Sequence, residues 1–148
     1  MLRVLLLLLY TFVLFQIAIE DSKYQKIRNI QIVKILILAL AGCLVIPEID
    51  MASRIFGMFA VSFPMMMINC VRPGSFGGGD LKLTFACGAF LGSEMLVFGT
   101  ICGIFAAGIY ASYMFLRKKS KNIRFALGPF LSLGYLLVTI CLLCKKIL

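Results

Sequence analysis

The sequence predicts an all-α fold, a polytopic transmembrane helix bundle of about six spans. Of its 148 residues, 62% are hydrophobic and only 14% are charged, whereas soluble domains are nearer half apolar and a quarter charged. Apolar stretches recur along the whole chain, and most approach the roughly 20 residues that a helix needs to cross a bilayer. We therefore expect residues 1–148 to form a single membrane-embedded domain, with no soluble domain.

The expected spans follow the apolar stretches in chain order: 2–19, 30–47, 55–71, 83–96, 97–116 and 125–144. The first is a leucine-rich run that resembles a signal peptide, but no small-residue cleavage site follows it, so we expect it to be retained. The fourth and fifth spans meet at residues 92–94 (GSE), the only interruption in a long apolar run. One continuous helix there would leave Glu94 in lipid at a cost of about 3 kcal/mol, so we expect a turn.

The basic residues predict how these spans are oriented. If the loop that follows the first span is cytoplasmic, that side of the membrane holds eleven of the fifteen Lys and Arg residues. The other four are expected on the outer side: Arg3, Arg54, Lys145 and Lys146. The positive-inside rule then places both termini outside the cell membrane. Anionic lipid headgroups account for the net charge of +9, so we expect a lipid partner and no nucleic acid.

The cysteines give no indication of a metal site. All six fall within or at the ends of apolar segments, and the chain contains no histidine. Cys141 and Cys144 have the spacing of half a zinc site, but no second pair exists. We expect these cysteines to be packing residues, with no metal and no cofactor.

Two of the six acidic residues could form a catalytic pair. Asp21 lies two residues after the first expected span and Asp80 lies three residues before the fourth, so both would lie at the cytoplasmic end of the bundle. Two neighbouring carboxylates share one proton, because ionising both is unfavourable. The ionised partner can take a proton from water while the protonated one hydrogen-bonds a scissile carbonyl. Without histidine, such a pair is the hydrolytic machinery that the composition best allows.

Three glycines, Gly77, Gly78 and Gly79, directly precede Asp80. Glycine permits positive φ and lets another backbone approach closely, as a substrate strand would. The same pattern also fits a flexible turn in which Asp80 caps the next helix. The two readings are compatible with each other.

Three segments, in this order, resemble the type IV prepilin peptidase family. Residues 77–83 (GGGDLKL) resemble its GxGD motif, G-x-G-D-x-K-L. Residues 21–29 (DSKYQKIRN) have the spacing of the basic segment that the family's first aspartate opens, with Arg28 where a proline is expected. Residues 124–134 (RFALGPFLSLG) resemble the family's P-F-G-P-F-L-x-x-G stretch.

This resemblance implies a membrane aspartyl endopeptidase that removes the short basic leader of a prepilin or pilin-like protein at the cytoplasmic face, in type IV pilus or secretion systems. It implies that Asp21 and Asp80 are the catalytic pair, without deciding which is the base. Lys82 would tune the pair or help to hold the substrate, although a lysine that reaches the lipid headgroups explains its position more simply. Glu20 would contact the basic leader. The oligomeric state stays open.

The longer family members carry an amino-terminal insert with paired CxxC motifs and methylate the new amino terminus. This chain has neither the insert nor room for it, and it resembles the short, protease-only type of Flp/Tad pilus systems. We therefore expect no methyltransferase activity.

Three alternatives stay open. Asp50, which follows Ile46-Pro47, could replace Asp21 in the pair, although it is expected on the outer face. A protease of the presenilin kind would carry a Tyr-Asp motif, which this sequence lacks. A non-catalytic protein, such as a small transporter or an assembly scaffold, would place polar residues at mid-membrane depth.

Overall fold

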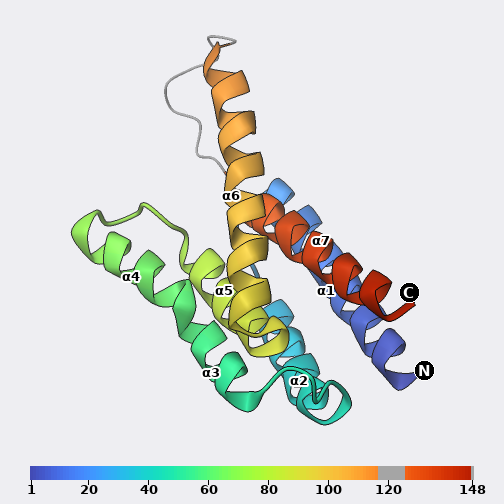
Figure 1. Ribbon diagram of the computed structural model, residues 1–148. Coiled ribbons are helices and arrows are strands. Elements are labelled where there is room, and N and C mark those ends of the chain that lie inside the picture. The colour runs from blue at the N-terminus through green and yellow to red at the C-terminus, as the bar shows by residue number, and fades with distance from the viewer. Residues whose placement is uncertain (117–125, 148) are drawn as a thin grey trace.

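The protein is a bundle of helices, seen in a computed structural model that describes residues 1–116 and 126–147 (Figure 1). The helices in these ranges are α1 (Leu2–Tyr24), α2 (Asn29–Val45), α3 (Met51–Ala60), α4 (Ser62–Val71), α5 (Gly78–Leu91), α6 (Ser93–Leu116) and α7 (Gly128–Ile147). The described residues contain no strand. The predicted all-α class is therefore confirmed.

In the part of the chain that the structure describes, three helical segments are long and apolar enough to cross a membrane: Leu2–Tyr24, Met51–Val71 and Ser93–Leu116. Shorter apolar helices cover Asn29–Val45 and Gly128–Cys144. The chain is thus a multi-pass membrane protein, and about six spans remain consistent with its helices.

The first helix shows how the sequence directs packing. Its exposed side chains are mainly leucine and phenylalanine, as suits a surface in contact with lipid. Its buried stripe includes Tyr10, Leu14, Ile17 and Asp21, whose spacing of four, three and four residues keeps them on one helix face. Asp21 therefore continues the packed face of α1 instead of pointing into lipid.

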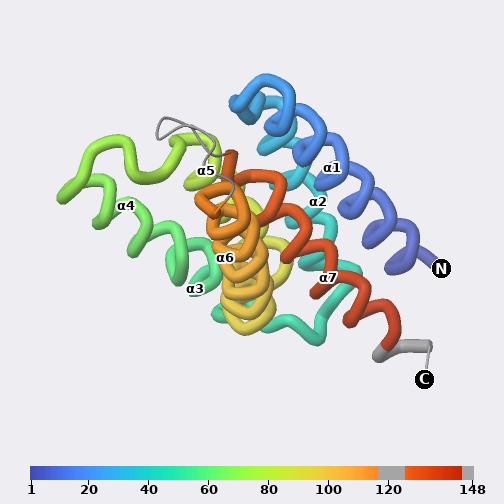
Figure 2. The backbone as a smooth tube through the Cα atoms, turned by 90° about the horizontal axis from the view of Figure 1, so that it is seen from above, coloured from blue at the N-terminus to red at the C-terminus, as the bar shows by residue number. Residues whose placement is uncertain are grey.

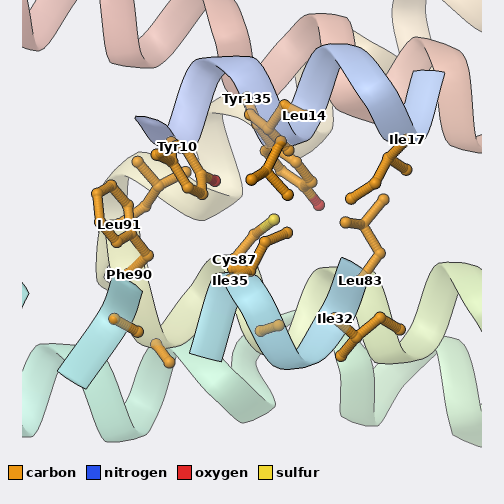
Figure 3. Packing of buried hydrophobic residues seen from close by; sticks show 14 of the residues in the cluster. Tyr10, Leu14, Ile17, Ile32, Ile35, Leu83, Cys87, Phe90, Leu91 and Tyr135 are labelled. Carbon is orange, nitrogen blue, oxygen red and sulfur yellow. The ribbon is translucent and has the colours of Figure 1, made fainter. Parts of the chain in front are cut away.

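Helix α5 is the centre of the bundle, in contact with α2, α3, α4, α6 and α7. Viewed from above, α7 lies between α1 and α6 (Figure 2). Figure 3 shows the core between these helices, with Leu14 of α1 and Tyr135 of α7 pointing toward Cys87 of α5. Near the end of α5, the rings of Tyr10 and Phe90 stack with centroids 4.0 Å apart.

Glycines allow the closest helix contacts. A Cβ on Gly57 would lie 2.7 Å from the carbonyl oxygen of Gly88, so α3 and α5 touch backbone to backbone. On α6, a Cβ at Gly103 would lie 2.8 Å from the carbonyl oxygen of Phe130, which belongs to α7. Small residues at helix interfaces are typical of membrane bundles, where close van der Waals packing drives association.

The third expected span, 55–71, lies within Met51–Val71, which is long and apolar enough to cross a membrane, but it is divided at Val61 into α3 and α4. Pro64 explains the break, since it has no N–H to donate to the carbonyl of Ala60 and its ring crowds that group. After the break, α4 leans away from the bundle (Figure 1).

The turn expected at residues 92–94 is confirmed, so the fourth span ends before the expected residue 96. Helix α5 ends at Leu91, Gly92 adopts φ 78°, and α6 begins at Ser93. Such a positive φ favours glycine, which explains why the chain turns at this residue. The last helix also begins later than the expected residue 125, at Gly128, because Pro129 fits the first turn of a helix.

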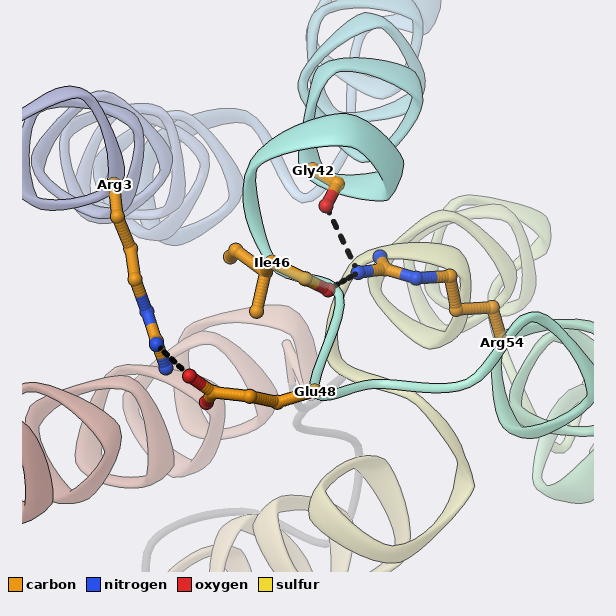
Figure 4. A network of polar contacts seen from close by, with 5 residues as sticks. All are labelled: Arg3, Gly42, Ile46, Glu48 and Arg54. Carbon is orange, nitrogen blue, oxygen red and sulfur yellow. Dashed lines mark hydrogen bonds and ion pairs between the residues drawn. The ribbon is translucent and has the colours of Figure 1, made fainter.

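Arg54 joins three helices at the end of the bundle opposite Asp80. Its side chain is 2% exposed, so it is not the outer loop charge that we expected. Its guanidinium donates hydrogen bonds of 3.0–3.3 Å to five backbone carbonyls, those of Gly42, Ile46, Ile49, Ala89 and Phe90. Figure 4 shows the bonds to the end of α2. Carbonyls at helix ends lack intrahelical partners and carry partial negative charge, so two helix ends neutralise this buried cation.

Candidate active site

The two aspartates singled out from the sequence lie at the same end of the bundle. Asp21 is in the last turn of α1 and Asp80 is in the first turn of α5. Their side chains are mostly covered, with 5% and 8% exposed. Both line the same two surface hollows, of about 390 and 650 Å³. The structure therefore brings together the two residues that the sequence placed far apart in the chain.

The glycine-rich loop holds Asp80 through a helix cap. Gly77 is the N-cap of α5, and its N–H donates a hydrogen bond to the Asp80 carboxylate three residues later. This is one half of a capping box, in which the third residue of the helix reaches back to the N-cap. A Cβ at Gly77 would lie 3.1 Å from Oδ2 of Asp80, which leaves a larger residue little room.

The other two glycines of this motif differ from each other. A Cβ at Gly79 would lie 3.1 Å from Cβ of Ile27, so this glycine lets the α1–α2 loop approach the start of α5. A Cβ at Gly78 would meet nothing within 4 Å. All three line the smaller hollow.

Asp21 is held by a helix that begins more than a hundred residues later. Its carboxylate accepts a hydrogen bond from the backbone N–H of Gly128, the first residue of α7. A Cβ at Gly128 would lie 2.8 Å from Cγ of Asp21 and closer still to Oδ2. We assigned no role to Gly128 from the sequence, although the Gly-Pro pair at 128–129 is a helix-start signal, and helix starts bind anions.

The two carboxylates interact electrostatically. Asp80 precedes the apolar part of α5, which begins at Leu83. Burial, and next the negative charge of Asp21, raise the pKa of Asp80 to about 6, while the Gly77 N–H opposes this rise. Two carboxylates coupled in this way titrate as a pair, and the pair holds one proton over part of the pH range.

The two hollows differ in their remaining walls. The smaller is lined by Lys26, Asn29 and Lys82, and the Lys82 ammonium donates a hydrogen bond of 3.1 Å to Oδ1 of Asn29. The larger is lined by residues 74–76 and 126–127. Its loop is fixed by Asn69 of α4, whose side-chain amide exchanges hydrogen bonds of 2.9 and 2.8 Å with the backbone of Phe76.

Glu20 does not line either hollow. Its Oε1 accepts a hydrogen bond of 3.3 Å from the Gln31 amide and lies 3.8 Å from the Arg28 guanidinium. In this arrangement Glu20 connects the end of α1 to the start of α2.

Asp50, the alternative partner for Asp80, lies at the other end of the bundle. It is the N-cap of α3 and lines a separate hollow together with Glu48 and Glu94. Arg3 pairs with Glu48 there (Figure 4). The basic run at 117–121 and Arg124 lie outside the described residues.

Fold and site together define a multi-pass helical membrane protein with two covered aspartates at one end of its bundle. A model of the type IV leader peptidase family matches residues 8–112, well over half of the chain. The protein therefore belongs to the type IV leader peptidase family, which confirms the resemblance found in the sequence. The match includes Asp21 and Asp80 but ends before Gly128. Searches of curated proteins and of solved structures gave no match.

Proposed function

We propose that this protein is a membrane aspartyl endopeptidase that removes the short basic leader from a prepilin or pilin-like protein. In this proposal Asp21 and Asp80 are the catalytic pair and the cut is made at the cytoplasmic face. Membership of the family supports a peptidase with a pilin-type substrate in general. The single observation that carries the choice of residues is that both carboxylates line the same two hollows and interact with each other.

The reaction follows from the protonation of the pair. The ionised carboxylate takes a proton from a water molecule, and the resulting hydroxide attacks the scissile carbonyl carbon. The protonated carboxyl donates a hydrogen bond to the carbonyl oxygen and stabilises the charge that develops there. Collapse of the tetrahedral intermediate breaks the C–N bond, and the leaving amine takes its proton from the pair. A new carboxylate and a new amine result, and no electrons are exchanged.

The shape of the site suits a peptide substrate. A peptide cut by the pair must extend on both sides of the scissile bond, and the two hollows offer space beside the same two aspartates. The excess of Lys and Arg on this side of the predicted topology supports a cytoplasmic site.

The test is leader removal from the host's own prepilin-like protein, co-expressed with the wild type or with Asp21→Asn, Asp80→Asn or Asp50→Asn. We expect the first two substitutions to slow processing by more than about 100-fold, the usual scale for loss of a general acid or base. Asp50→Asn is the matched control and should process at the wild-type rate, because Asp50 lies at the other end of the bundle.

Membrane levels of all four proteins are compared by immunoblot, so that lost activity is not confused with lost protein. Full processing by Asp80→Asn would rule out the aspartyl peptidase and favour a scaffold or transporter. Loss of processing in Asp50→Asn alone would move the site to the opposite end of the bundle.

A further inference from the structure

Among the described residues, the start of α7 supplies the contact that holds the Asp21 carboxylate from outside α1. Gly128 donates its N–H to this carboxylate. The three atoms nearest to a Cβ built at Gly128 are Oδ2, Cγ and Cβ of Asp21. No side chain, even a methyl group, fits between α7 and Asp21 without moving one of them.

Asp21 needs a donor from another helix because of its own position. It lies at the end of α1, and its own carbonyl already accepts the N–H of Gln25. Carbonyls at a helix end carry partial negative charge, which disfavours an ionised carboxylate. The start of a helix carries partial positive charge, so the start of α7 compensates for the end of α1.

The position of α7 relative to α5 is itself fixed by buried hydroxyl groups. The fully buried Tyr135 of α7 shares a hydrogen bond of 3.1 Å with Thr100 of α6 and another with Thr84 of α5. Thr84 in turn donates a hydrogen bond of 2.6 Å to the carbonyl of Asp80. A chain of contacts therefore connects the helix that holds Asp21 to the turn that carries Asp80.

We propose that Gly128 is a positioning residue of the peptidase, whose N–H and missing side chain hold the Asp21 carboxylate toward Asp80. This inference rests on the proposed function, since it assigns Gly128 to the same reaction. Gly128 lies beyond the part of the chain that the family model matches.

The experiment is a double-mutant cycle with Gly128→Ala, Asp21→Ala and both changes together. In the wild-type background, Gly128→Ala should lower the thermal midpoint in detergent by about 5 °C or more, because the new methyl group displaces the Asp21 carboxylate. In the Asp21→Ala background the carboxylate is gone, and the same change should shift the midpoint by less than about 1 °C. Circular dichroism at 222 nm gives the midpoints.

Activity provides the second measurement. Gly128→Ala should lower kcat for leader removal by about 100-fold, as expected when a reacting group is misplaced by about 1 Å. KM should change by less than about threefold, because the other residues that line the two hollows are unaltered. The matched control is Gly108→Ala on α6, where a Cβ would meet nothing within 4 Å, and it should leave both kcat and the midpoint unchanged.

Each outcome decides for or against the positioning role. Equal loss of stability in both backgrounds, or wild-type kcat in Gly128→Ala, would overturn it. If Gly128→Ala alone does not accumulate, accumulation of the double variant supports the proposal and its failure to accumulate contradicts it. A wild-type protein that cleaves no prepilin would sink the proposed function, while the stability cycle would still decide whether Gly128 and Asp21 are coupled.

Discussion

Each proposed catalytic carboxylate is paired with a glycine that serves it in two ways. Gly77 donates its N–H to Asp80, and Gly128 donates its N–H to Asp21. At both glycines a Cβ would crowd the carboxylate itself. Backbone donors cannot rotate away as side chains can, so they fix the direction in which each carboxylate points. The glycines thus belong to the site as much as to the turns that contain them.

The pH dependence of leader removal should reflect the shared proton. The pair is active while it holds one proton, and the pKa of Asp80 is raised to about 6. Because this proton is lost as the pH rises through about 6, kcat/KM should fall by about tenfold per pH unit above that value. Rates measured between pH 5 and pH 8.5 in detergent would show this limb.

Circular dichroism at each pH serves as the control for unfolding. A rate that stays constant from pH 6 to pH 8 would contradict a pair that needs its proton. Measuring kcat and KM separately at each pH distinguishes two causes of the pH dependence. A change in KM alone would mean that the pH affects substrate binding and not the chemical step.

At the scale of the helices, Arg54 connects α2, α3 and α5 at the end of the bundle away from the site. Replacing it with methionine would keep much of the volume but remove the donors to five backbone carbonyls. Unpaired buried carbonyls are costly, so we expect Arg54→Met to destabilise the protein by about 3 kcal/mol. The thermal midpoint in detergent measures this loss.

Arg3 provides a matched control at the same end of the bundle. It pairs with Glu48; the Arg3 side chain is 11% exposed and that of Glu48 is 66% exposed. Because solvent reaches the carboxylate, we expect the pair to contribute about 1 kcal/mol. Arg3→Met should therefore lower the midpoint much less than Arg54→Met does. Equal effects would show that Arg54 does not hold α2, α3 and α5 together.

The helices that the sequence predicted well are those whose limits depend on local signals. The stripe from Tyr10 to Asp21 follows the helical repeat, and the turn at Gly92 interrupts an apolar run. The break before Pro64 was missed. The residues around it form an apolar run of membrane length, and hydrophobicity alone does not show that proline removes one backbone hydrogen bond of the helix.

Long-range contacts could not be predicted in the same way. Asp21 and Asp80 were recognised as a pair from chemistry and resemblance, but nothing in the sequence shows that Gly128 meets Asp21. Arg54 looked like a loop charge, because its partners are backbone carbonyls that every residue carries. Which carbonyls accept hydrogen bonds from Arg54 is known only once the packing of the three helices is known.

At the scale of the whole molecule, the orientation in the membrane can be tested by cysteine labelling. The starting protein has all six native cysteines replaced by alanine. We expect Ala52→Cys to react with a membrane-impermeant maleimide in intact spheroplasts, and Ser75→Cys to react only after lysis. Both residues are exposed, Ala52 at the end that carries Asp50 and Ser75 at the end that carries Asp80.

This expected orientation follows from the excess of basic residues in the loops on the Asp80 side. The cysteine-free parent must still process its substrate, which is the control for correct folding. Labelling of Ser75→Cys before lysis would place the proposed site outside the cell and contradict a cytoplasmic cut.

The contact between Asp21 and Gly128 also has a consequence for biosynthesis. The ribosome makes the carboxylate on the first helix and its backbone donor on α7, so synthesis separates them by more than a hundred residues. At about 5–20 residues per second, some seconds pass between the two. Until α7 inserts beside α1, the nascent protein holds both aspartates but lacks the group that orients one of them. In the proposed reaction, a chain in which only α1–α6 have inserted should therefore not yet remove a leader.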